Sequence, residues 1–283
     1  MATFTNQATL RYNGNVINSN ITTGELLEVL SATKTAVINT YNQGSDVTYV
    51  INIVNSGSIA FTGVSVNDNL GAYTFGTETL VPLDYVDGSV RYYVNGVLQP
   101  APAVDPGPPL IISGLVVPAN GVTTVIYVAR ANQYAPLDLE GVITNTAVIS
   151  GGGVTEITVT EIVTPESGAR LTIAKSISPR TVTENGRVTY TFVIQNTGNT
   201  PAIVSDDVGI TDTFNPILTD LTVTFNEIAW TEGVNYTYSE ATGEFATVPG
   251  QITIPAAVYI QDSVTGEWIV EPGVGVLTVT GTV

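Results

Sequence analysis

The feature that most constrains how this chain can fold is an internal repeat of one long motif. A Val-Thr-Tyr stretch followed by an Asn-x-Gly turn occurs twice in the 283 residues, 141 positions apart (188 − 47). Each copy is preceded by one of the only two lysines, Lys34 and Lys175. A repeat of this length is the size of a whole domain. The sequence therefore predicts two copies of one domain in tandem.

Both copies have the pattern of short β-strands. Apolar and polar residues alternate in runs that end at Gly, Asn or Pro, as residues 47–54 do before the turn at 55–57. Asn95-Gly96 stands between two such runs, and this pair accepts the positive φ angles of a type I′ hairpin turn. Charged residues make up only 12% of the chain. We expect an all-β protein with two tandem immunoglobulin-like β-sandwich domains.

The two copies end differently. The first continues through an alternating run at 143–149, a glycine-rich turn at 151–153 and a second run at 154–163. The second copy stops at Val283, which is opposite Ala129 of the first. The second copy therefore lacks the closing hairpin that the first contains.

A similar hairpin stands at the other end of the chain. Runs at 4–10 and 16–23 flank Asn13-Gly14, and the second run leads into Glu25 as residues 154–163 lead into Glu166. We therefore expect three parts, which are a detached N-terminal donor hairpin at 1–25, a complete domain at 26–166, and an acceptor domain without closing strands at 167–283.

A sandwich without its last hairpin exposes an apolar groove and unpaired backbone groups. Each orphaned buried N–H or C=O costs about 1–3 kcal/mol, and open sheet edges pair with other chains. A two-stranded hairpin alone is only marginally stable in water. Addition of the hairpin to the open sandwich would therefore stabilise the hairpin and also cover the groove and pair its backbone groups. The donor residues that face one side of the hairpin are Phe4, Asn6, Ala8 and Leu10.

The donor can in principle complete its own chain or another copy. It is joined to the first domain with almost no linker, so a closed monomer would need the two domains to double back on each other. Donation to the next copy is a head-to-tail contact, which propagates into a filament unless it closes into a ring. A hairpin that only decorates the first domain would leave the missing strands unexplained.

The motif set resembles the Gram-positive surface-protein conserved-repeat family, an immunoglobulin-like domain of unknown function. Members carry a lysine on the first strand, then Val-Thr-Tyr, Asn-Thr-Gly, Val-x-Val-x-Asp-x-Leu and a late Asn-Thr-Ala. In this chain these are Lys34 and residues 47–49, 55–57, 64–70 and 145–147. In the second copy the Asn-x-Ala element is displaced to residues 6–8.

In size, two-repeat layout and lack of a visible secretory signal, the chain is also similar to the major structural proteins of clostridial spore appendages. That resemblance implies a structural role outside the cell without a leader peptide. The chain departs from sortase-assembled pilins, which carry a leader, a sorting motif and a membrane tail.

Alternation also points a lysine, an aspartate and an asparagine toward the interior of each domain. They are Lys34, Asp68 and Asn145 in the first domain, and Lys175 and Asp212 with Asn6 of a neighbouring copy in the second. One interpretation is a satisfied Lys–Asp pair with an Asn hydrogen bond, or a lysine that reaches the rim.

The other interpretation is a spontaneous isopeptide bond, as in the pilin-type immunoglobulin folds that the chain resembles. Burial disfavours the charged forms of both groups, so a neutral amine attacks the amide carbon while the protonated aspartate polarises its oxygen. Lys34–Asn145 would then staple one subunit, and Lys175–Asn6 would join two.

Composition excludes several classes of function. The net charge of −17 argues against nucleic acid and anionic membranes as partners. The chain has no cysteine and no histidine, so disulfides, thiolate chemistry and histidine-based catalysis are excluded. No run is long and apolar enough for a membrane span, and the N-terminus has no signal-peptide pattern. We expect no enzyme, no cofactor and no metal site.

Three functions compete. The leading one is the structural subunit of an extracellular bacterial fibre, at a cell or spore surface without a classical signal peptide. Its partners would be other copies of itself, with anchor and tip proteins at the ends. The second is a monomeric surface adhesin or ligand-binding module. The third is an enzyme such as a glycoside hydrolase, which the lack of catalytic motifs disfavours.

Overall fold

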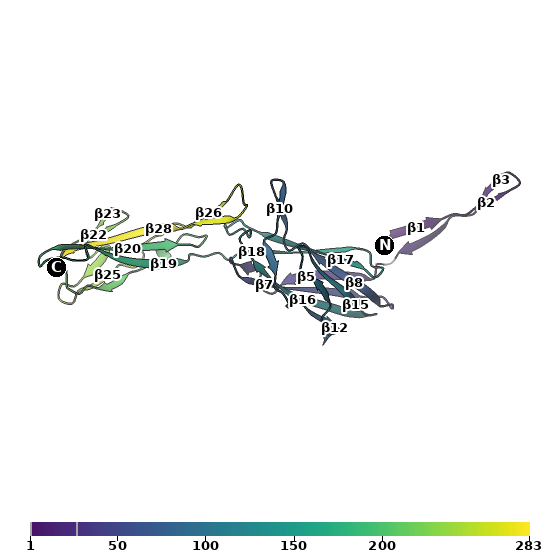
Figure 1. Ribbon diagram of the computed structural model, residues 1–283, viewed down its shortest axis with the longest axis horizontal. Coiled ribbons are helices and arrows are strands. Elements are labelled where there is room, and N and C mark those ends of the chain that lie inside the picture. The colour runs from purple at the N-terminus through teal and green to yellow at the C-terminus, as the bar shows by residue number, and fades with distance from the viewer. Residues whose placement is uncertain (1, 27) are drawn as a thin grey trace. The chain divides into compact units, whose positions relative to one another are not determined.

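The computed structural model describes residues 2–26 and 28–283, and it confirms the expected all-β architecture (Figure 1). Apart from strands, those residues form one short 3-10 turn, η1 (Val204–Asp206). In the part of the chain described, no helix has the length and apolar character needed to cross a membrane.

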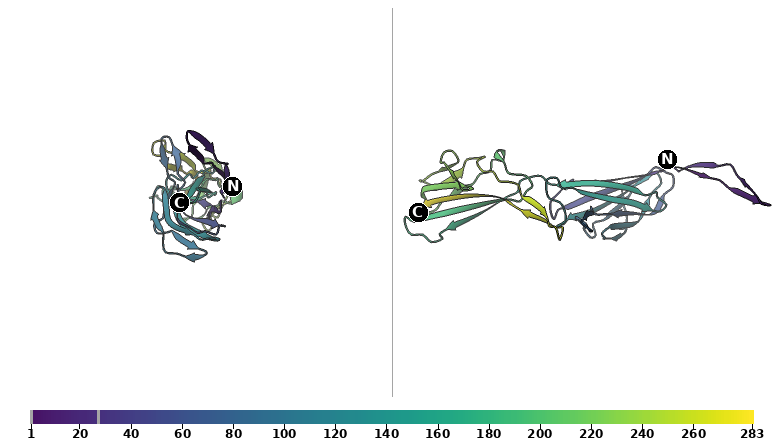
Figure 2. Two further views of the ribbon diagram at one scale, coloured as in Figure 1. Left: turned by 90° about the vertical axis from the view of Figure 1, so that its right-hand side faces the viewer. Right: turned by 90° about the horizontal axis from the view of Figure 1, so that it is seen from above.

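The chain forms two compact units. Unit 1 consists of Met1–Asn39, Gly44–Asn132 and Ile143–Val163, and unit 2 of Thr40–Gln43, Gln133–Val142 and Thr164–Val283. The domain boundaries expected after residues 25 and 166 stay a prediction. Each unit is built of facing layers of strands (Figure 2).

Unit 1 has two main sheets. The first has the order β13–β12–β16–β7–β5, and the second β14–β15–β8–β17–β18, with β6 pairing the end of β18. The first sheet contains β5 (Leu30–Ala36), β7 (Asp46–Asn55), β12 (Arg91–Val94), β13 (Val97–Leu98) and β16 (Gly121–Ala131), to which β11 (Leu83–Tyr85) also pairs. The second contains β8 (Phe61–Asp68), β14 (Ala103–Asp105), β15 (Leu110–Val117), β17 (Ile143–Gly151) and β18 (Ile157–Pro165). β6 (Thr40–Tyr41) and the last two residues of β18, with which it pairs, belong to unit 2. A separate ribbon joins β9 (Tyr73–Phe75) and β10 (Glu78–Leu80).

The core of unit 1 lies between these sheets and follows the alternation of the sequence. Ile51 and Ile53 on β7, Val125 on β16 and Ile149 on β17 are all fully buried. The expected hairpin turn is present, because Asn95 and Gly96 have φ angles of 49° and 79° between β12 and β13.

Unit 2 has the same kind of first sheet but a shorter second one. The first has the order β19–β20–β28–β22–β23, and the second β21–β25–β24. The strands are β19 (Leu171–Ser178), β20 (Arg187–Asn196), β21 (Thr211–Thr213), β22 (Thr219–Phe225), β23 (Ile228–Trp230), β24 (Tyr236–Tyr238), β25 (Glu244–Thr247) and β28 (Gly273–Thr282). A ribbon of β26 (Val258–Gln261) and β27 (Trp268–Glu271) precedes β28. Phe192, Phe214, Phe245, Leu277 and Val279 belong to its core.

The N-terminal segment forms a two-part ribbon. β1 (Ala2–Asn6) pairs with β4 (Thr22–Leu26), and β2 (Thr9–Tyr12) pairs with β3 (Asn15–Asn18). The predicted runs at 4–10 and 16–23 are therefore interrupted rather than continuous. Two residues, 7 and 8, lie opposite three, 19 to 21, so the extra residue forms a bulge that breaks the ladder. Every side chain from Phe4 to Thr23 is exposed.

Candidate functional site

The lysine, aspartate and asparagine expected to face the interior of the first domain meet in the core of unit 1. Lys34 on β5, Asp68 on β8 and Asn145 on β17 are 4%, 0% and 0% exposed. The Nζ of Lys34 lies 2.6 Å from Oδ2 of Asp68 and donates to the backbone oxygen of Asn145 at 3.0 Å. Three strands that are far apart in the sequence thus bring an amine, an acid and an amide together.

Two tyrosines complete this cluster. Tyr49 on β7 pairs directly with Tyr127 on β16, and their rings stack with centroids 5.4 Å apart. The hydroxyl of Tyr127 donates to Oδ2 of Asp68 at 2.5 Å and accepts from Nδ2 of Asn145 at 3.2 Å. The Nζ of Lys34 lies 4.9 Å above the Tyr49 ring. We call these five residues, Lys34, Tyr49, Asp68, Tyr127 and Asn145, the unit 1 cluster.

Neither tyrosine was predicted from the sequence as a member of the site. Tyr49 lies in the repeated Val-Thr-Tyr motif, so its recurrence as Tyr190 was a usable signal. Tyr127 has no such signal, because only the pairing of β7 with β16 brings it beside Tyr49.

Burial sets the electrostatics of the unit 1 cluster. Desolvation lowers the pKa of Lys34 from 10.5 to about 8, while the charge and hydrogen bond of Asp68 and the charge of Glu161 oppose that shift. Burial also raises the pKa of Tyr127 well above its usual value, and the charge of Asp68 adds to this effect. Lys34 therefore loses its proton more readily than an exposed lysine, and Tyr127 stays a neutral hydroxyl.

The amide of Asn145 has one unsatisfied atom. Its Oδ1 is buried and has no hydrogen-bond partner, whereas its Nδ2 is held by Tyr127. A buried carbonyl oxygen without a partner is costly and rare. The cluster can therefore supply a nucleophilic amine, a proton acceptor and an amide carbon to attack.

Unit 2 contains the corresponding lysine and aspartate, but in a different environment. Lys175 on β19 and Asp212 on β21 form an ion pair, with side chains 39% and 18% exposed. The Nζ of Lys175 lies 4.6 Å above the ring of Tyr190 and 5.4 Å from that of Phe214. Asn6, the predicted third member, lies on β1 with an exposed side chain.

Both sheets of unit 2 end in a strand with a free edge. β8 of unit 1 is paired on both sides, by β15 and β17. Its counterpart β21 pairs only with β25 among the described strands, and β19 is the last strand of the other sheet. All residues of β19 are exposed, with Leu171 at 38%, Ile173 at 57% and Ile177 at 36%. We call this opening between β19 and β21 the acceptor groove.

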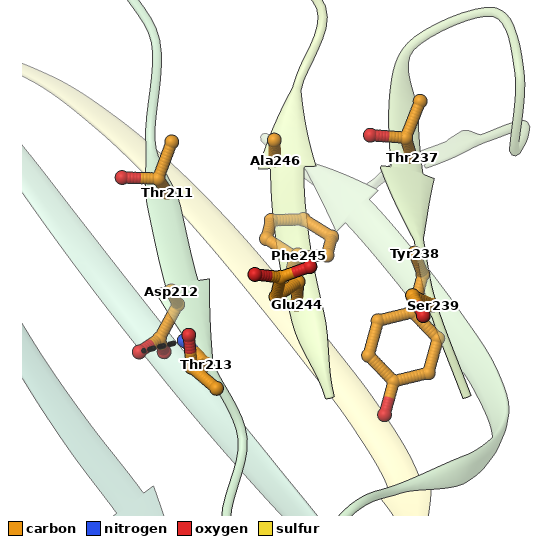
Figure 3. A pocket seen from close by; sticks show the side chains of 9 residues that line it. All are labelled: Thr211, Asp212, Thr213, Thr237, Tyr238, Ser239, Glu244, Phe245 and Ala246. Atoms are coloured by element: carbon orange, nitrogen blue, oxygen red, sulfur yellow. Dashed lines mark hydrogen bonds between the residues drawn. The ribbon is translucent and has the colours of Figure 1, made fainter. Parts of the chain in front are cut away.

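Two hollows lie near these strands. One, of about 570 Å³, is lined by apolar residues that include Leu171 of β19, Ala202 and Val208. The other, of about 590 Å³, lies over β21, β24 and β25, where Figure 3 shows Thr211 and Glu244 beside Asp212. Across residues 2–26 and 28–283, no group of acidic side chains could hold a metal ion.

The comparisons with known proteins give structural likenesses only. No family model and no curated protein matches the chain. The pilus backbone RrgB of Streptococcus pneumoniae is 12% identical, with a TM-score of 0.35 over 86% of this chain and 55% of that one. The major pilin subunit BcpA of Bacillus cereus is 10% identical, with a TM-score of 0.36 over 96% and 73%.

A collagen-binding domain of a Staphylococcus aureus adhesin is 12% identical, with a TM-score of 0.30 over 49% of this chain and 99% of that domain. The chain spans about half the length of the pilus backbone (55%). The likeness to these three structures is one of fold alone, so the function has to be argued from the geometry of the chain itself.

Proposed function

We propose that this protein is the structural, non-enzymatic subunit of a fibre outside the cell. Residues 1–25 of one copy fill the acceptor groove of the next copy and supply the strands that unit 2 lacks. The partner is thus another copy of the same chain, with anchor and tip proteins needed only at the fibre ends.

One observation carries this proposal, which is that β1 and β4 of the N-terminal ribbon have the pairing register of β17 and β18. Asn145 lies opposite Glu161 in unit 1, and Asn6 lies opposite Thr22 in the ribbon. The offset is 139 residues on both strands (145 − 6 and 161 − 22). β1 and β4 are therefore already paired as the strands that close unit 1 are, whereas beyond the bulge at residues 7–8 and 19–21 the pairing of β2 with β3 is shifted by one residue.

The register in unit 1 also gives the expected seat of the donor. Ala147 lies opposite Asp68 and Ile149 opposite Val66. By the repeat, Ala8 is expected opposite Asp212, and Leu10 opposite Ile210. That seat brings Asn6 over Lys175 and carries the apolar tip of the ribbon toward the hollow beside Leu171.

The contact removes a large exposed apolar surface. Phe4 and Leu10 are 60% and 61% exposed in the ribbon, and Ile173 on β19 is 57% exposed. Full burial of one such side chain stabilises by about 1.5–3 kcal/mol. The new backbone hydrogen bonds along β21 add about 0.5–1.5 kcal/mol each.

Chain geometry favours donation to another copy. Leu30, where β5 begins, lines a hollow with Ile157, where β18 begins. β18 then runs about 20 Å to Val163 before the chain enters unit 2. The ribbon is therefore attached at the end of unit 1 opposite to the exit toward unit 2.

The seat in unit 2 adds to this separation. In this seat Asn6 lies over Lys175 and the tip of the ribbon points toward Leu171. The end of the ribbon that is joined to unit 1 then lies at the Ser178 end of β19, about 24 Å from Leu171. Three residues, 27 to 29, join the ribbon to β5, with a reach of about 14 Å. A closed monomer would thus need unit 2 folded back along unit 1, whereas an end-to-end row of copies needs no such bend.

Covalent bonds can lock this assembly. In unit 1 the Nζ of Lys34 attacks Cγ of Asn145, a new C–N bond forms, the bond to Nδ2 breaks, and ammonia leaves. The same reaction between Lys175 and Asn6 of the next copy joins two subunits. The buried Lys–Asp–Asn arrangement of unit 1 and the paired Lys175 and Asp212 of unit 2 support both bonds.

Negative-stain microscopy and sedimentation of the full chain test the polymer. Deletion of residues 1–25 is expected to abolish fibres, and Leu10→Asp to do the same by placing a charge in the groove. Leu98→Asp is the matched control, because Leu98 is an equally exposed hairpin residue of unit 1, at 56%. A full chain that stays monomeric and binds matrix proteins or glycans would favour the adhesin function instead.

A further inference from the structure

Besides the closing strands, one hydroxyl group distinguishes the two lysine sites. Tyr49 pairs with Tyr127 across β7 and β16, whereas its counterpart Tyr190 pairs with Val279 across β20 and β28. The position of Tyr127 in this pairing is therefore occupied by Val279 in unit 2. The expected match of Val283 with Ala129 was wrong by two residues, since Gly121 and Gly273 are the residues that lie opposite Asn55 and Asn196. Unit 2 still keeps an aromatic ring on its tyrosine, because Phe214 stacks on Tyr190 with centroids 4.9 Å apart.

Phe214 stands where unit 1 has Leu70, two residues after the aspartate in both repeats. The pair Leu70 and Tyr127 in unit 1 is thus replaced by Phe214 and Val279 in unit 2. All four side chains are buried. The stacked ring is retained and the hydroxyl is lost, so the need for a ring against the tyrosine does not account for the hydroxyl of Tyr127.

That hydroxyl completes an unbroken line of hydrogen bonds. The Nζ of Lys34 contacts Oδ2 of Asp68 at 2.6 Å, and the same oxygen accepts from the Tyr127 hydroxyl at 2.5 Å. The Tyr127 oxygen in turn accepts from Nδ2 of Asn145 at 3.2 Å. The line runs from the attacking nitrogen to the nitrogen that must leave.

We infer that Tyr127 is a catalytic residue of the Lys34–Asn145 bond, which passes a proton from Asp68 to the leaving amide nitrogen, and that unit 2, without this hydroxyl, forms its bond more slowly. The inference rests on the proposed covalent bonds. Subunits then dock through backbone pairing first and become locked later, which leaves time for misplaced subunits to dissociate.

The protons and bonds of this step balance within the cluster. The ammonium of Lys34 gives one proton to Asp68 and attacks Cγ of Asn145 as a neutral amine. Asp68 passes its proton to Tyr127 while Tyr127 passes its own to Nδ2, which leaves as ammonia when the C–N bond breaks. The second proton of the attacking nitrogen returns Asp68 to its protonated form, so no oxidant or other reactant is needed.

The raised pKa of Tyr127 fits a relay rather than a free acid. The hydroxyl gives up its proton only as it receives another from Asp68. Tyr92 on β12 serves as the control outside the unit 1 cluster, because it is a buried tyrosine of unit 1 whose hydroxyl accepts from the backbone N–H of Val116 at 2.8 Å.

Cell-free synthesis of the full chain, stopped in denaturant at set times and followed by intact-mass measurement, gives the rate of ammonia loss in unit 1. General acid–base catalysis contributes about 10²–10⁴-fold to such steps, so Tyr127→Phe is expected to slow the bond by that order. Tyr92→Phe is expected to react as the parent does, and Asp68→Asn not to react. A cross-linked peptide joining Lys34 and Asn145 identifies the bond.

A second experiment introduces the tyrosine hydroxyl into unit 2. The double variant Phe214→Leu/Val279→Tyr exchanges the pair for that of unit 1, with one carbon and the hydroxyl oxygen added, and it is expected to speed the appearance of Lys175–Asn6 peptides in fibres. An unchanged rate in this variant overturns the slow-locking part. If the variant does not assemble, Tyr127→Phe still decides the role of the hydroxyl.

The outcomes separate this inference from the proposed function. If the Tyr127→Phe variant forms the bond as fast as the parent, the proton relay is overturned, whereas the proposed fibre and the proposed covalent bonds are unaffected. A parent chain that never loses ammonia overturns the covalent bonds and the relay together, while microscopy decides the fibre independently. A parent that reacts and a slow Tyr127→Phe variant support the relay.

Discussion

Lys34 and Lys175 occupy the same place in the two repeats, yet only one of them is buried. Each pairs with the aspartate of the facing sheet, but the side chain of Lys34 is 0% exposed and that of Lys175 is 39% exposed. The strands that bear the lysines are alike, so they do not cause the difference. The cause is β17 and β18, which cover Lys34 and have no counterpart among the described strands of unit 2.

The comparison shows that the closing hairpin, rather than the lysine strand, makes the site. β17 supplies Asn145, and β18 supplies Glu161, whose carboxylate accepts from the backbone N–H of Ala36 on β5 at 3.1 Å. Without these strands the lysine and aspartate remain a partly exposed ion pair, which contributes little. Docking of a donor would turn that pair into a buried reactive group.

The largest expected difference between the two sites is in the cost of removing the aspartate. Asp68→Ala leaves Lys34 buried without its partner, and a broken buried pair destabilises by about 3–5 kcal/mol. Asp212→Ala removes the partner of a lysine that is still in contact with water, so the unpolymerised chain should lose about 1 kcal/mol or less.

Denaturant unfolding can separate the two effects, because both tryptophans, Trp230 and Trp268, belong to unit 2. Tryptophan fluorescence follows unit 2, and circular dichroism follows the whole chain. Equal losses for the two variants would contradict the claim that β17 and β18 create the difference.

The sequence predicted the outline of this comparison but not its details. The repeat and the missing strands follow from the similarity of the two copies. The inward direction of Lys34, Asp68 and Asn145 follows from period-2 alternation, which depends only on the local chain. Tyr127 could not be predicted, because its partnership with Tyr49 depends on the register between two strands distant in sequence. The chemical roles assigned to these side chains stay predictions.

Two further features depended on non-local structure. The bulge between residues 7–8 and 19–21 breaks the ribbon, although the runs read as continuous strands in the sequence. The ribbon of β26 and β27 is an insertion that the first copy lacks, so the repeat gave no template for it. Comparison of the two copies predicts the structure of the segments that both contain, but it cannot predict the structure of a segment that only one of them contains.

A smaller effect is expected from one pair of facing donor residues that differs from the corresponding pair in β17 and β18 of unit 1. Ile143 and Val163 face each other in β17 and β18, and the corresponding pair in the ribbon is Phe4 and Gly24. A methyl group on Gly24 would overlap the ring of Phe4. The larger residue and the missing side chain thus compensate.

Gly24→Val is expected to weaken assembly by about 1–3 kcal/mol, since overpacking displaces the ring. The double variant Phe4→Ile/Gly24→Val recreates the pair of unit 1 and should recover most of that loss. The critical concentration for fibre formation measures both. A double variant as weak as Gly24→Val alone would show that the groove does not treat the ribbon as a copy of β17 and β18.

The smallest expected effect is the response of the unit 1 bond to pH, which tests whether burial prepares Lys34. Desolvation lowers the pKa of Lys34 to about 8, against an unfolded value of about 10.4. Below pH 8 the folded Lys34 holds the proton that the relay needs, and above it that proton is lost. The rate of ammonia loss should therefore be level below pH 8 and fall about tenfold per pH unit above it.

The same shift fixes the sign of the stability change before the bond forms. Between pH 8 and about 10.4 the unfolded chain binds more protons at Lys34 than the folded chain, so the stability of unreacted unit 1 rises with pH across that range. The bond slows while the fold becomes more stable, and a loss of structure cannot explain the slower reaction.

Glu161→Gln sharpens the test, because the charge of Glu161 raises the pKa of Lys34 and the amide can still accept from Ala36. The fall in rate should then begin at a lower pH than in the parent. A rate that instead rises up to pH 8 and then stays level would contradict this expectation. It would mean that attack by the free amine limits the reaction and that protonation of the leaving nitrogen does not. The Tyr127 hydroxyl would then not cause a difference in rate between unit 1 and unit 2.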